Sequence, residues 1–255
     1  MKQGIKRIYL LDEIRGIAIL AMIVHHAFLD VGTVLGLDWG YEIFNFLCCF
    51  QPLFWTAFIL ISGICSQLSR NSVKRGAVVF AAAVLITFVT AVVMPKLNMM
   101  KSEIYFGILH CLGICMIVSG LLKKQIENTK NYIGFSILTV LFLATYSVSK
   151  GTLFSFIKLP DFLYETNILM PFGFFNSSFE SADYFALFPW LFMFLIGSFI
   201  GKYAKDNKFP DFTYKVHSKF LCFVGKNALW FYLSHQVVLY AVFYAIQWII
   251  IWYYS

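Results

Sequence analysis

Apolar stretches of about 20 residues alternate with short polar links along almost the whole chain. A helix of that length, rising 1.5 Å per residue, crosses roughly 30 Å of hydrocarbon. Hydropathy and helix length therefore predict membrane spans near residues 14–35, 46–68, 77–94, 104–122, 132–149, 185–202 and 221–252. Gln51 and Pro52 interrupt the start of the second span, and the last span is long enough to tilt or kink. The predicted fold is an all-α polytopic membrane bundle of about seven helices, with residues 1–255 forming a single domain.

The composition supports this prediction and excludes an ordinary soluble domain. Hydrophobic residues make up 60% of the chain and charged residues only 13%, against roughly a quarter charged in soluble domains. Lys2, Lys6 and Arg7 precede the first apolar stretch, as in a signal peptide. That stretch is too long for a signal peptide and lacks a small-residue cleavage site, so we expect an uncleaved first span.

The distribution of basic residues predicts the orientation. The net charge is +7, but the lysines and arginines lie in links between spans and form no continuous face for nucleic acid. With the N-terminus inside, only Lys96, Lys101, Lys150 and Lys158 of the 20 basic residues fall outside. The positive-inside rule then predicts a cytoplasmic N-terminus and a C-terminus on the outer side.

The longest link, residues 150–184, also falls on the outer side and is apolar and aromatic rather than polar. We expect it to fold back over the membrane or to be partly re-entrant. The six cysteines lie in or beside apolar stretches without the spacing of metal ligands, so we expect core packing and no metal site.

The first predicted span carries three ionisable residues that a membrane tolerates only when they are paired or hydrated. Arg15 and His26 are eleven positions apart, which places them on one helix face about 16 Å apart along the axis. Asp30 lies one turn beyond His26 on the same face. An arginine that anchors the cytoplasmic interface is the alternative explanation for Arg15.

Three further titratable residues are predicted at similar depth in the outer leaflet. His110 begins the fourth span, Asp183 opens the sixth, and His235 lies beyond the midplane of the seventh. Together with His26 they predict a buried polar site, although for each residue alone a helix-to-helix hydrogen bond explains the placement equally well.

Four strings carry a resemblance to a known family: "LDEIRGIAILAMIVHHAFLD", "FGILHCLGI", "SADYFALFPWLFMFLIGSFIGKY" and "GKNALWFYLSHQ". In this order they resemble bacterial relatives of the heparan-alpha-glucosaminide N-acetyltransferase catalytic domain, nearly end to end. The first string also resembles the acyltransferase-three family, in which an arginine or lysine, ten intervening residues and a histidine form the hallmark. Here those residues are Arg15 and His26.

The resemblance implies a membrane acyltransferase in a bacterial inner membrane. It would take an acyl group, expected to be acetyl, from cytoplasmic acetyl-CoA and pass it to an amine or hydroxyl of a sugar or glycan reached from the outer side. Arg15, Arg70 and Arg75 are candidate contacts for the CoA phosphates. We expect His26 to be the general base with Asp30 orienting its imidazole, and His110 is the alternative base.

The remaining candidates concern the acceptor and the partners. Asp183, His235 and Trp190 are expected to contact the acceptor or polarise the carbonyl group. Direct attack and an acetyl-histidine intermediate would need the same residues, so both stay open. Membrane lipids are expected partners, nucleic acid is not, and a homo-oligomer stays open. A transporter or flippase without covalent chemistry is the rival function, since it too uses intramembrane histidines and carboxylates.

Overall fold

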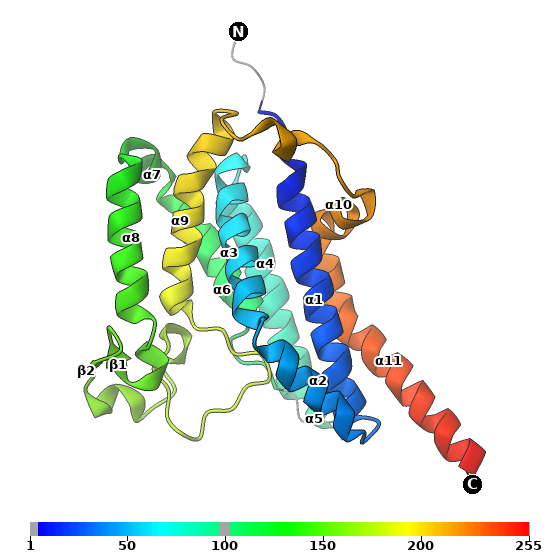
Figure 1. Ribbon diagram of the computed structural model, residues 1–255. Coiled ribbons are helices and arrows are strands. Elements are labelled where there is room, and N and C mark those ends of the chain that lie inside the picture. Colours follow the sequence, from blue (N-terminus) through cyan, green and yellow to red (C-terminus); the bar gives the residue numbers. More distant parts are fainter. Residues whose placement is uncertain (1–4, 97–102, 255) are drawn as a thin grey trace. The chain divides into compact units, whose positions relative to one another are not determined.

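The computed structural model describes residues 5–96 and 103–254, and helices dominate it (Figure 1). Two compact units are present. The first combines Met1–Phe58 with Phe209–Ser255, and the second is Ile59–Lys208.

The first unit is built from both ends of the chain. Its elements are α1 (Tyr9–Thr33), α2 (Asp38–Cys48), the start of α3 (Gln51–Leu68), η5 (Asp211–Tyr214), α10 (Lys219–Lys226) and α11 (Ala228–Tyr254). α1 contacts α2, α10 and α11. Contacts between α1 and the C-terminal segment advance together along both sequences, from Ile19 beside Val224 to Val34 beside Gln247. α1 and α11 therefore run in the same direction.

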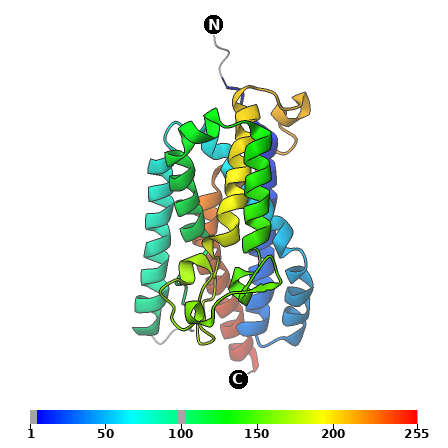
Figure 2. The ribbon, with the colours of Figure 1, turned by 90° about the vertical axis from the view of Figure 1, so that its left-hand side faces the viewer.

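The second unit contains the rest of α3 and the middle of the chain. Its helices are α4 (Ser72–Phe88), η1 (Val89–Val93), α5 (Met94–Lys96), α6 (Ile108–Leu121), α7 (Lys123–Asn128), α8 (Asn131–Thr145), η2 (Val148–Lys150), η3 (Asp161–Tyr164), η4 (Met170–Phe172) and α9 (Leu187–Lys205). α4 packs on α6, and α8 packs on α9 (Figure 2).

Six helical segments in the described part of the chain are long and apolar enough to cross a membrane. They are Tyr9–Thr33, Gln51–Leu68, Ser72–Lys96, Asn131–Lys150, Leu187–Lys205 and Ala228–Tyr253. The chain is thus an all-α integral membrane protein, as predicted. The remaining predicted span, 104–122, corresponds to α6, an apolar helix of 14 residues, which by length alone falls short of a full crossing.

The second and the last predicted span are each divided between two observed helices. The second predicted span, 46–68, is divided between α2 and α3, and Pro52 lies in the first turn of α3, where its missing N–H breaks no helical hydrogen bond. The last predicted span begins as α10 and breaks at Asn227, whose side chain donates to the carbonyl oxygen of Phe223 at 2.9 Å. This contact satisfies a carbonyl group at the end of α10.

Glycines let helices approach closely in both units. A Cβ atom at Gly16 would collide with the carbonyl oxygen of Leu221, and one at Gly225 with that of Asp12. In the second unit Gly63 and Gly197 lie against each other where α3 crosses α9. Small residues let helix backbones approach closely, and the resulting van der Waals packing drives helix association in lipid, where the hydrophobic effect does not.

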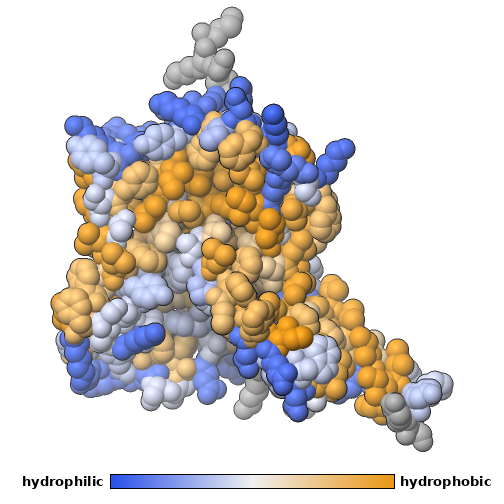
Figure 3. All heavy atoms as spheres, in the orientation of Figure 1, coloured by the Kyte–Doolittle hydropathy of each residue, from blue (hydrophilic) through white to orange (hydrophobic). Residues whose placement is uncertain are grey.

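Large apolar side chains remain exposed, as lipid contact requires. Trp248 and Trp252 of α11 are 68% and 70% exposed, and hydrophobic side chains cover most of the far half of this helix (Figure 3). On α8, Ile137 and Leu143 are similarly exposed. The bilayer is the natural solvent for such surfaces.

The segment 150–184 has no long helix. It forms a small antiparallel hairpin of β1 (Thr152–Leu153) and β2 (Ile157–Lys158), followed by the short turns η3 and η4. Its re-entrant character stays a prediction.

Candidate functional site

A continuous chain of polar side chains joins α1 to α11 in the first unit. Nδ1 of His26 lies 3.0 Å from Oε1 of Gln236. Nε2 of the same amide donates to both carboxylate oxygens of Asp30, at 3.2 and 3.1 Å. Asp30 is 1% exposed, so this amide supplies hydrogen bonds that a buried carboxylate needs.

The chemistry of these groups fixes where the proton of His26 lies. The Asp30 carboxylate only accepts hydrogen bonds, so the NH₂ group of Gln236 faces it and the amide oxygen faces His26. That oxygen also only accepts, so Nδ1 of His26 carries the hydrogen. In the neutral imidazole, Nε2 then carries the lone pair. Among the described residues, no hydrogen bond reaches this Nε2.

The structure also brings His235 to this network. Its ring lies edge to face with that of His26, with centroids 5.1 Å apart. Nδ1 of His235 donates to the carbonyl oxygen of Tyr232 at 2.6 Å, which leaves the lone pair on Nε2. That Nε2 is buried and has no hydrogen-bond partner within the described ranges.

His25 faces a different set of neighbours. Its ring is buried, lies 4.3 Å from the ring of Phe44 between centroids, and contacts the amide nitrogen of Gln51 at 2.8 Å and Sγ of Cys48 at 3.5 Å. These contacts connect α1 to α2 and α3, so His25 is part of the packing of the first unit.

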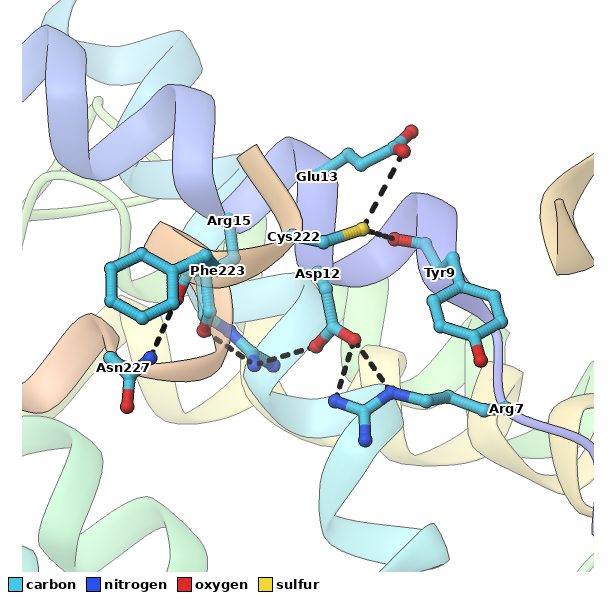
Figure 4. Close-up of polar contacts among 9 residues, drawn as sticks. Arg7, Tyr9, Asp12, Glu13, Arg15, Cys222, Phe223 and Asn227 are labelled. Carbon is cyan, nitrogen blue, oxygen red and sulfur yellow. Dashed lines mark hydrogen bonds and ion pairs between the residues drawn. The ribbon is translucent and has the colours of Figure 1, made fainter. Parts of the chain in front are cut away.

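At the opposite end of α1, Arg15 lies among partners rather than alone (Figure 4). Its Nη1 is 3.8 Å from Asp12 and 3.5 Å from the carbonyl oxygen of Gly225. Asp12 also pairs with Arg7 at 2.8 Å. α1 is one continuous helix, so the predicted separation of Arg15 and His26 along its axis, about 16 Å, holds.

Beside this cluster, Glu13 caps the start of α10. Its carboxylate accepts from the backbone N–H groups of His217 and Ser218 at 2.6 and 2.8 Å, and from Sγ of Cys222 at 3.5 Å. Burial and the neighbouring carboxylate raise the pKa of the Cys222 thiol, which keeps it protonated as a donor. These contacts fix α10 against α1.

His110 lies in the second unit with both ring nitrogens engaged. Its Nδ1 accepts from the N–H of Gly107 at 3.1 Å, so Nε2 carries the hydrogen and lies 3.3 Å from Oγ1 of Thr87. Phe106 stacks on the ring at 5.3 Å between centroids. The lone pair of His110 is thus used to cap α6.

The other predicted residues of the second unit each have neighbours of their own. Asp183 accepts from the N–H of Ile108 at 3.2 Å and so also caps α6. Trp190 packs against Phe185, with ring centroids 5.0 Å apart. Arg70 and Arg75 are exposed, in and just after the link between α3 and α4. No group of three or more metal-ligating side chains occurs in the described part of the chain.

Residues 7–237 match the family model described as heparan-alpha-glucosaminide N-acetyltransferase, catalytic. The chain belongs to this family. No match was found among the curated proteins or among the solved structures.

Membership of the heparan-alpha-glucosaminide N-acetyltransferase family implies a membrane acetyltransferase-type activity. The matched region includes His26, Asp30 and His235, and it also includes Gln236, which the sequence analysis missed. The available signal was an amide beside a histidine in an otherwise apolar helix, where a polar group needs a partner.

Proposed function

We propose that this chain transfers an acetyl group from acetyl-CoA to an amine or hydroxyl of a sugar or glycan, with His26 as the general base. The observation that supports this best is the chain of hydrogen bonds from Asp30 through Gln236 to His26. It directs the lone pair of His26 onto Nε2, the nitrogen that no described residue occupies. Proton abstraction needs an imidazole with one ring nitrogen whose lone pair is not already used in a hydrogen bond.

In the proposed reaction, Nε2 of His26 removes the proton of the acceptor as its nitrogen or oxygen attacks the thioester carbonyl. A bond forms between the acceptor atom and the carbonyl carbon, and the carbon–sulfur bond breaks. The CoA thiolate leaves and takes the proton from the imidazolium of His26. CoA thiol and acetylated acceptor are the products, and His26 returns to its neutral form. The acetyl-histidine route through the same residue remains the alternative.

His26 is a better candidate base than His110 because of the hydrogen bonds of each ring. The lone pair of His110 already accepts from the N–H of Gly107. Using it as a base would break this contact and leave a helix N–H without its partner. We therefore assign His110 a positioning role at the start of α6.

His235 is proposed to contact the acceptor through its Nε2. Because this nitrogen carries a lone pair, it can accept a hydrogen bond from an acceptor N–H or O–H. It cannot polarise the thioester carbonyl in the neutral form, since that requires a donor. Asp183 and Trp190 are kept as proposed acceptor contacts.

Candidate contacts for the CoA phosphates are proposed in each unit separately. They are Arg15 near the cytoplasmic end of α1 in the first unit, and Arg70 and Arg75 near the cytoplasmic end of α4 in the second. Arg70 and Arg75 are exposed and could reach a phosphate directly. Arg15 is mostly buried and pairs with Asp12, so a phosphate would share its guanidinium group with that carboxylate. About 16 Å of helix separates Arg15 from His26, comparable to the reach of a pantetheine arm.

A thiol-release assay tests this function. The purified protein, in detergent or nanodiscs, is mixed with acetyl-CoA and a panel of amino and hydroxyl sugars, and free CoA thiol and acetylated product are both measured. We expect acceptor-dependent thiol release that matches product formation. A complete lack of transfer over a broad panel would contradict the proposal and favour a transporter, which uptake into vesicles would then detect.

A further inference from the structure

Gln236 occupies the position between the two residues on which the proposed function depends. We propose that Gln236 is a positioning residue for His26 and that Asp30 acts on His26 through this amide; the inference rests on the proposed function. In a serine-protease triad the carboxylate contacts the histidine directly, whereas here a neutral amide lies between the two groups.

The side chain of Gln236 makes hydrogen bonds with both His26 and Asp30. Gln236 accepts from Nδ1 of His26 at 3.0 Å and donates to Asp30 at 3.1 and 3.2 Å. Without Gln236, Nδ1 of His26 would lose its acceptor, and either ring nitrogen could carry the hydrogen. The lone pair would then be on Nε2 in only a fraction of the molecules.

A positive charge forms on the imidazole of His26 during the proposed reaction. When Nε2 takes the acceptor's proton, the positive charge spreads over both ring nitrogens, and the bond from Nδ1–H to the amide oxygen strengthens. The Asp30 carboxylate polarises the same amide from its other side, which makes the oxygen a better acceptor. The carboxylate can thus stabilise the imidazolium without touching it.

A purely structural role is the competing explanation, because an amide that joins two membrane helices stabilises their packing. The chain contains a matched control for this role. Gln247 lies on the same helix α11, and its Nε2 donates at 2.8 Å to the carbonyl oxygen of Val34, which directly follows the last residue of α1. Within the described part of the chain, this contact does not involve the side chains of His26 or Asp30, and the link to Asp30 is only the backbone N–H of Val34, which donates to its carbonyl oxygen.

The experiment compares Gln236→Leu with Gln247→Leu. Turnover, KM for the acceptor and Kd for acetyl-CoA are measured, and the protonated nitrogen of His26 is identified by NMR of ¹⁵N-histidine-labelled protein, with His26→Gln for assignment. Gln236→Leu should lower turnover by roughly 10- to 100-fold, by analogy with the loss of partners that orient metal-bound histidines. It should also shift hydrogen from Nδ1 to Nε2 of His26 and leave Kd unchanged. Gln247→Leu should change none of these.

Two further variants sharpen the test. Gln236→Glu keeps an acceptor for Nδ1–H, so it should keep the wild-type tautomer and more turnover than Gln236→Leu; it also serves if the leucine variant does not fold. Asp30→Asn should lower turnover in the wild-type background but have no further effect beside Gln236→Leu.

Equal turnover and tautomer in Gln236→Leu and Gln247→Leu would overturn the positioning role. If the double variant lost turnover by the product of the losses in Asp30→Asn and Gln236→Leu, the claim that Asp30 acts through the amide would be overturned. If the wild type transfers no acetyl group, the proposed function fails, while the NMR comparison still decides whether Gln236 sets the tautomer.

Discussion

His26 and His235 belong to opposite ends of the chain, yet their rings lie edge to face with centroids 5.1 Å apart. Each ring donates from Nδ1, one to Gln236 and the other to the carbonyl oxygen of Tyr232. Two imidazoles that are both protonated on Nδ1 place two lone pairs in the same region of the first unit.

Replacement of His26 by alanine should abolish most of the transfer. Loss of a general base typically costs about 10²- to 10⁴-fold in rate, whereas CoA binding should survive because the phosphates bind elsewhere. His110→Ala should lower activity less, mainly through weaker capping of α6. Transfer kinetics and acetyl-CoA titration of both variants provide the measurement. Retained transfer without His26 but none without His110 would move the base to α6.

Replacement of His235 by phenylalanine should weaken acceptor use without weakening the fold. A buried polar atom without a partner costs about 1–3 kcal/mol, so removal of Nε2 should leave the melting temperature unchanged or raise it. The kcat/KM for the acceptor should fall by roughly 10-fold, the loss of one hydrogen bond of about 1.4 kcal/mol. A clear fall in melting temperature with normal kinetics would assign His235 to packing instead.

Arg15→Ala tests the proposed CoA contact. If a phosphate shares the guanidinium group with Asp12, acetyl-CoA binding should weaken by about 2–5 kcal/mol, as when one partner of a buried charge pair is removed. Arg70→Ala is the control for an exposed cation, for which we expect less than about 1 kcal/mol. Calorimetric titration of both variants provides the comparison. An unchanged Kd with a lower melting temperature would make Arg15 an anchor between α1 and α10.

Cysteine labelling tests the topology. In a background without the six native cysteines, Arg70→Cys and Lys124→Cys should react only from the cytoplasm, and Lys158→Cys only from outside. If all six longer segments cross the membrane, the shared direction of α1 and α11 requires an odd number of crossings. We therefore predict that the short α6 crosses as well. Labelling of Lys124→Cys from the outer side would contradict this count.

The sequence was sufficient to predict the helical membrane fold. Backbone groups in lipid must be satisfied within one segment, so a long apolar stretch has few alternatives to a helix. Helical periodicity likewise placed Arg15, His26 and Asp30 on one face of α1. In contrast, the break at Asn227 depends on one side chain that bonds back to Phe223, and no pattern in composition or hydropathy marks it.

Gln236 was not predicted because its proposed role depends on its partners. An amide beside His235 in a mostly apolar helix signals a polar contact, but Asp30 and His26 lie far away in sequence, so the partners could not be identified. The tautomers of His26, His110 and His235 could not be predicted from the sequence either, because each depends on whether the neighbouring atom is a donor or an acceptor.

The first unit joins residues 1–58 to residues 209–255, two segments that are synthesised at different times. A ribosome releases α1 long before α11, so His26 and Asp30 enter the membrane while the amide that connects them has not yet been made. The hydrogen-bonded network is completed only when the final helix is inserted. Chains that stall or are cleaved before Gln236 would carry Asp30 in the membrane without the amide that donates to it, a cost that the complete chain avoids.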